Sequence, residues 1–110
     1  MDQRTKAAIE RLLAVAQRDT GQSRRVANFL LAWHNARENG GWDLTDLWDV
    51  DNEIAEDMML ALTYIRHNRE YLNERRLGYR KEIEAIWEFW RGGQAVTDYP
   101  DAPLVKSPGA

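Results

Sequence analysis

No proline occurs before Pro100 in this chain, and glycine before that point is confined to positions 21, 40, 41, 78, 92 and 93. Proline disrupts helix interiors, and glycine often marks the residue at which a helix stops. Between the glycines, apolar residues recur three and four positions apart, whereas strand-type alternation is not sustained anywhere. The chain is therefore predicted to be all-α.

Four main helices are predicted, over about residues 2–18, 23–38, 51–68 and 79–91, with a short acidic helical turn starting at Asp43. Each helix carries an apolar stripe that is expected to face a common core. The stripes are Ile9, Leu12, Leu13 and Ala16; Val26, Leu30 and Trp33; Ile54, Met58, Ala61, Leu62 and Ile65; and Ile83, Ile86, Trp87 and Trp90.

A single domain is expected, because 110 residues suit one hydrophobic core. Residues 1–92 should form a compact helical bundle. Residues 93–110 contain all three prolines and little periodicity, so a flexible, disordered tail is predicted there.

The composition narrows the functional classes. No apolar run is long enough to cross a membrane, and the N-terminus lacks the apolar core of a signal peptide, so a cytoplasmic protein is expected. Cysteine is absent, which excludes disulfides, thiolate metal sites and cysteine nucleophiles.

The most unusual stretch is "GGWDLTDLWDVDNEIAED", residues 40–57, which holds seven carboxylates and no lysine or arginine. The whole chain has a net charge of −3, so the remainder is net positive. Such a dipolar layout favours a partner of defined charge, or self-association.

Helix capping is one explanation of these acids. Asp43 and Asp51 each precede a helical pattern, Asp46 lies where a capping-box acid would lie, and Glu53 falls in a first turn. Ser23 is the expected N-cap of the second helix. In the short turn, Leu44, Leu47 and Trp48 are expected to face inward.

A calcium loop is a second explanation, because Asp49, Asp51 and Glu53 alternate as the first EF-hand ligands do. The sixth and twelfth positions would then be Ile54 and Leu60, where glycine and glutamate are needed. No metal site is therefore predicted.

A binding face is the third explanation. Caps leave Asp49, Glu56 and Asp57 unexplained, and an acidic ridge beside an exposed Trp42 would suit an arginine-rich surface. Alternatively, arginines of the same chain fold over the acids; the candidates are Arg24, Arg25, Arg75 and Arg76. The predicted partner-binding residues are Trp42, Asp43, Asp46, Asp49, Glu53, Glu56 and Asp57.

Catalytic patterns are weak. His34 and His67 have no paired metal-ligand spacing, and His34 is expected to be a hydrogen-bonded structural residue. Ser23 and Ser107 lie in no nucleophile elbow, and no glycine-rich phosphate loop is present. A non-enzyme without a cofactor is predicted.

Two other functions stay open. A homodimer could use Met59, Leu60, Tyr64 and Phe89 as an apolar face. The segment "AQRDTGQSRRVANFLLAW" is typical of a helix-turn-helix, with Arg24 and Arg25 opening the second helix. That helix is apolar nearly all round and the chain is acidic overall, which disfavours direct nucleic-acid binding.

Residues 14–58, with "TGQSRRVANFLLAW" and "GGWDLTDLW" as the recognisable parts, resemble a family of small uncharacterised proteins of Gram-negative bacteria. Members are commonly encoded on plasmids and integrative elements, and no catalytic residues carry over. The resemblance implies a mobile-element setting. The leading functional prediction is a non-catalytic acidic interaction module that inhibits a partner with a basic, nucleic-acid-handling surface.

Overall fold

The computed structural model describes residues 1–92. It contains α1 (Gln3–Ala16), α2 (Gly21–Asn39), the 3-10 helix η1 (Leu44–Trp48), α3 (Asn52–His67), α4 (Arg80–Trp87) and the π-helical turn η2 (Glu88–Gly92). No strand occurs within these residues, so the all-α prediction of four main helices plus a short turn is confirmed. The predicted tail, residues 93–110, lies outside the described part of the chain.

The first two helices begin at side-chain caps. Asp2 accepts a hydrogen bond from the Thr5 backbone N–H (2.7 Å), and this bond lowers the pKa of the Asp2 carboxyl. Thr20 accepts from the Ser23 N–H (3.0 Å), so α2 starts at Gly21. The prediction that Ser23 is the cap is wrong, because Thr20 has the extended backbone that a cap requires and Ser23 is buried in the first turn.

α2 changes direction near its end. Asn35 has φ −168° and ψ 86°, which interrupts the helix, and its side-chain oxygen accepts from the Glu38 N–H (3.3 Å). Asn35 therefore caps the last turn in the way that Asp2 caps α1. That turn ends at Gly40, whose φ of 94° favours glycine, as the Asn39-Gly40-Gly41 sequence predicts.

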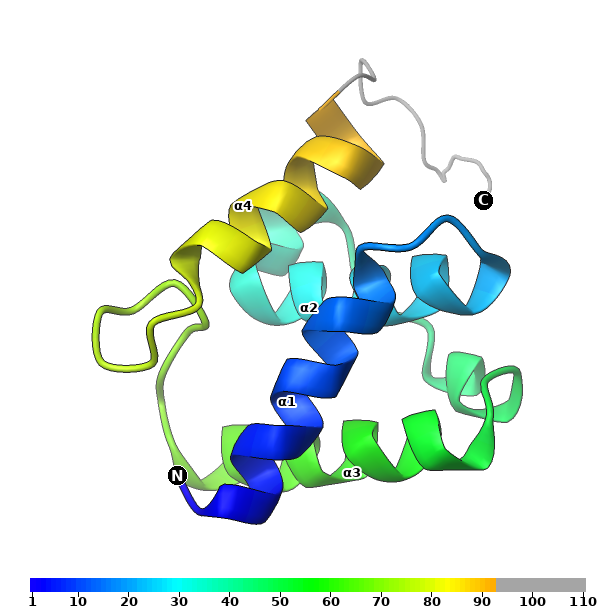
Figure 1. Ribbon diagram of the computed structural model, residues 1–110. Coiled ribbons are helices and arrows are strands. Elements are labelled where there is room, and N and C mark those ends of the chain that lie inside the picture. The colour runs from blue at the N-terminus through cyan, green and yellow to red at the C-terminus, as the bar shows by residue number, and fades with distance from the viewer. Residues whose placement is uncertain (93–110) are drawn as a thin grey trace.

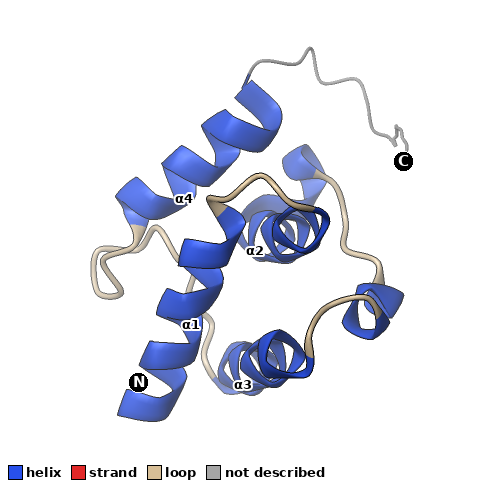
Figure 2. Ribbon diagram, turned by 45° about the vertical axis from the view of Figure 1, so that its right-hand side comes forward, coloured by secondary structure: helices blue, strands red, loops and turns tan. Residues whose placement is uncertain are grey.

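α1 is the helix that the others share. It packs against α2, α3 and α4, and Figures 1 and 2 show α3 and α4 on different sides of α1. The predicted stripe of α1 is buried throughout, and the stripes of α2, α3 and α4 supply most of the remaining core. The fully buried large side chains are Ile9, Leu12, Val26, Leu30, Leu31, Met58, Leu72, Ile83 and Ile86.

The connector between α3 and α4, residues 68–79, is held by Glu70. Its backbone carbonyl accepts from the Trp33 indole N–H (3.0 Å), and its carboxylate accepts from the Tyr64 hydroxyl and pairs with Arg76 (2.9 Å). Burial, reinforced by Glu70, raises the pKa of Tyr64 to about 12. This segment is therefore packed onto the domain although it forms no helix.

No helix within residues 1–92 combines the length and the apolar character needed to span a bilayer.

Candidate functional site

The acidic stretch leaves α2 at Gly40 and returns to the core at Trp42. The Trp42 ring is partly buried and meets Phe29 edge to face, with ring centroids 4.8 Å apart. The indole nitrogen is inaccessible and makes no hydrogen bond to the described residues. The prediction of an exposed Trp42 is therefore wrong.

η1 follows, and Asp43 caps it as predicted. The Asp43 carboxylate accepts from the Thr45 N–H (2.9 Å) and hydroxyl (2.8 Å). Both bonds lower the pKa of the Asp43 carboxyl, and the bond from the backbone N–H has the larger effect. The cap fixes where the five-residue helix η1 begins.

Two apolar side chains of η1 face outward. Leu44 is 68% exposed and Trp48 is 81% exposed, whereas Leu47 packs against the core. The prediction that all three face inward is wrong for Leu44 and Trp48. It assumed α-helical spacing, whereas in a 3-10 helix with three residues per turn Trp48 lies about a third of a turn away from Leu44. Trp42 and Leu47 supply this segment's contact with the core, so Trp48 projects from the surface.

Arg25 of α2 lies beside two of the η1 acids. Its Nε atom is 3.5 Å from Asp46 and 4.0 Å from Asp49. The Asp46 side chain is only 16% exposed, and this burial raises its pKa although Arg25 opposes the shift. Asp49 is 60% exposed, so it offers most of its carboxylate outward.

Asp51 and Asp57 are occupied within the chain. Asp51 holds the N-cap position of α3, but its carboxylate makes no capping bond and accepts from the Gln22 amide (3.3 Å) instead. Asp57 is buried and accepts two bonds of 2.9 Å from Arg11 of α1. The expectations that Asp51 caps with its side chain and that Asp57 faces outward are therefore wrong.

Glu53 and Glu56 are exposed on α3 and form no ion pair with residues 1–92. The seven acids thus divide into three groups. Asp43 and Asp49 stand at the two ends of η1, Glu53 and Glu56 lie on α3, and the other three acids have partners within the chain. We call Asp43, Leu44, Trp48 and Asp49 the η1 surface; it is the candidate functional site.

Arg11 is the residue of this region that the sequence reasoning missed. The available signal was the spacing of Arg4, Arg11 and Arg18, seven residues apart, which places them on one side of a helix. Arg24, the other arginine opening α2, stays exposed.

The predicted apolar dimer face is not assembled. Met59 (49%) and Phe89 (52%) are exposed, but Leu60 is only partly exposed and Tyr64 is buried. Phe89 also belongs to η2, which Figure 1 shows at the far end of the molecule from α3. These four residues therefore do not share one exposed surface.

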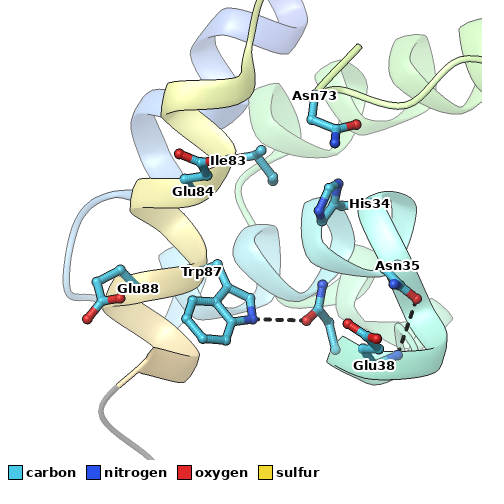
Figure 3. A pocket seen from close by; sticks show the side chains of 9 residues that line it. His34, Asn35, Glu38, Asn73, Ile83, Glu84, Trp87 and Glu88 are labelled. Atoms are coloured by element: carbon cyan, nitrogen blue, oxygen red, sulfur yellow. Dashed lines mark hydrogen bonds between the residues drawn. The ribbon is translucent and has the colours of Figure 1, made fainter.

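A separate cavity of about 380 Å³ lies between the end of α2 and α4 (Figure 3). The Trp87 indole N–H donates to Asn39 Oδ1 (3.1 Å) at one side, while Glu38, Glu84 and Glu88 also line it. His34 lies in this cavity's wall, and its Nδ1 is buried with no hydrogen-bond partner in the described residues. The expectation of a hydrogen-bonded His34 is therefore wrong at that atom.

Trp87 itself is 43% exposed, so it is a less complete member of the core stripe than the sequence predicts. Within residues 1–92, no three histidine or carboxylate side chains are gathered as metal ligands would be.

Comparison with curated proteins and with solved structures finds no match. Residues 6–91, by contrast, match a family description across all four main helices and η1. The chain therefore belongs to the Family of unknown function (DUF7673).

Proposed function

We propose that this protein is a non-catalytic interaction module whose η1 surface binds a basic region of a protein partner. The observation that carries the proposal is Trp48, 81% exposed at the end of a capped helix and next to the largely exposed Asp49. Tryptophan is a frequent centre of protein interfaces.

Arginine is the partner residue that suits this arrangement. A guanidinium group stacks on indole and pairs with carboxylate, so one arginine can engage Trp48 and Asp49 together. Leu44 adds apolar area on the same short helix. Arg25 lies near both Asp46 and Asp49, and Asp49 is the more exposed of these two acids, so Asp49 is the carboxylate that can meet a partner beside Trp48.

The kind of partner follows from the resemblance to small proteins of Gram-negative plasmids and integrative elements. In that setting we propose a cytoplasmic inhibitor that occupies a surface with which the partner handles nucleic acid. Direct DNA binding through α2 is a weaker candidate, because Arg25 is already engaged by Asp46 and Asp49.

The test is affinity capture from a bacterial lysate with the whole chain and two variants, Trp48→Ala and Asp49→Lys. We expect each variant to lose the captured protein, and capture by the unmodified chain to weaken as salt is raised. Tyr71→Ala is the matched control, since Tyr71 is another exposed aromatic residue (53%) and lies outside η1. Capture that survives both η1 variants, or that Tyr71→Ala abolishes equally, contradicts the proposal.

A further inference from the structure

A groove of about 730 Å³ runs between α1 and α3, and its two walls have opposite charge. Arg4, Arg11 and Arg18 form the basic wall on the α1 side. The acidic wall, on the α3 side, consists of Asp51, Glu53, Glu56 and Asp57. None of the η1 surface residues lines this groove.

The order of residues along each helix produces the two walls. Positions seven apart complete nearly two helical turns, so Arg4 and Arg11 lie one above the other on α1, and Arg18 follows just beyond its end. Glu53 and Glu56 are three residues apart and share a side of α3 in the same way. Each wall is therefore a row of like charges.

Only one pair closes across the groove. Arg11 binds Asp57, whereas Arg4, Arg18, Glu53 and Glu56 make no ion pair with the described residues. Between the walls lie apolar side chains that the fold leaves partly or fully accessible. They are Ala14, Val15, Ile54 and Leu60.

This distribution restricts the occupant. A nucleic acid would be repelled by the acidic wall, and a uniformly basic peptide would be repelled by the arginines. An occupant must offer acid opposite Arg4 and Arg18 and base opposite Glu53 and Glu56. The groove of a second copy of this chain offers both, because it has one acidic wall and one basic wall.

We propose that a second copy of this chain binds in the groove, related to the first by a two-fold axis that runs along it. A two-fold interface pairs the same surface of both copies. Rotation about an axis along the groove brings the basic wall of each copy against the acidic wall of the other. Rotation about an axis across the groove would place arginine against arginine, which the charges oppose. The accessible apolar side chains of the two grooves are covered by each other in the first arrangement.

Charge exchange tests the arrangement directly. One variant carries Arg4→Glu and Arg18→Glu, and the other carries Glu53→Lys and Glu56→Lys. Sedimentation velocity over a concentration series should show a dimer for the unmodified chain and monomers for each variant alone, with the dimer weakened at least about tenfold. An equimolar mixture of the two variants should restore a dimer, because both pairs of walls are again of opposite sign.

The matched control is Arg37→Glu with Lys81→Glu, which changes the net charge as much as the first variant but at exposed positions outside the groove. It should dimerise as the unmodified chain does. If charge reversal impairs folding by circular dichroism, Arg4→Gln with Arg18→Gln provides a milder change with the same expected direction. A chain that stays monomeric throughout, or a dimer that persists in both reversed variants, overturns the proposal.

Discussion

Arg11 of α1 donates two hydrogen bonds of 2.9 Å to Asp57 of α3, one from Nε and one from Nη2. The two partners differ in burial: the Arg11 side chain is 60% exposed and the Asp57 side chain only 10%. This bidentate geometry joins α1 to α3 through two residues that are 46 positions apart in sequence.

The difference in burial predicts an asymmetric response to mutation. Arg11→Met should destabilise the domain more than Asp57→Asn, because it leaves the buried carboxylate without its partner. Leaving a buried polar group unsatisfied typically costs about 1–3 kcal/mol. Urea unfolding followed by circular dichroism would measure both variants. Equal losses, or a larger loss for Asp57→Asn, would show that the ion pair is not asymmetric in this way.

The two tryptophans around η1 should behave oppositely. Trp42→Ala removes a ring that packs on Phe29 and is expected to lower the free energy of unfolding by about 2–4 kcal/mol. Trp48→Ala alters an exposed side chain and should change it by less than about 0.5 kcal/mol. Iodide quenching of fluorescence supplies the second measurement: Trp48→Phe should remove the largest single share of the quenchable emission, because Trp48 (81%) is more exposed than Trp87 (43%). A large stability loss on Trp48→Ala would contradict the exposed position of this residue.

These two positions also mark where prediction from sequence stops. The stripe from Ile9 to Ala16 is buried as expected, because a 3.6-residue period reports directly on the face that a helix turns to the core. The acidic stretch has no such period, and the predictions of an exposed Trp42 and an inward-facing Trp48 were both wrong. Trp42 is the ring that is partly buried because it contacts Phe29, and this tertiary contact cannot be read from the local sequence.

The acids were predictable only in part for a related reason. Asp43 acts on a backbone group two residues away, so its role as a cap follows from local sequence. Asp57 is neutralised by Arg11, which is brought to it only by the crossing of α1 and α3. Capping is a local property, whereas the exposure of a carboxylate depends on the whole fold.

Asp43 and Asp46 should give stability differences with opposite dependence on pH. Burial raises the folded-state pKa of Asp46 above its ordinary value of 3.8, so the folded state binds this proton more strongly. The stability of the unmodified chain then falls as pH rises through the folded-state pKa of Asp46. Over that interval the stability of Asp46→Asn should rise relative to that of the unmodified chain. Hydrogen bonds from Thr45 lower the pKa of Asp43, whose stabilisation is lost as pH falls towards and below 3.8. The stability of Asp43→Asn should therefore fall relative to that of the unmodified chain as pH rises. Thermal unfolding between about pH 3 and 7 would measure both differences, and slopes of the same sign would contradict this assignment.

Gly40 and Gly41 offer a matched test of how the acidic stretch leaves α2. Gly40 has φ 94° and ψ 159°, a region that other residues rarely adopt, whereas Gly41 does not have a positive φ. A Cβ atom added at either position would meet nothing within 4 Å, so the two substitutions differ in backbone strain alone. Gly40→Ala should lower the free energy of unfolding by about 1–3 kcal/mol, and Gly41→Ala should leave it unchanged within about 0.5 kcal/mol. Chemical denaturation of both variants provides the comparison.

The strain at residue 40 would also disturb Asn39, whose carbonyl accepts from Arg91 Nε (3.3 Å) and Nη2 (3.2 Å). Equal stabilities of the two variants would mean that the chain can leave α2 by another backbone path, and the direction in which η1 projects would then not be fixed by Gly40.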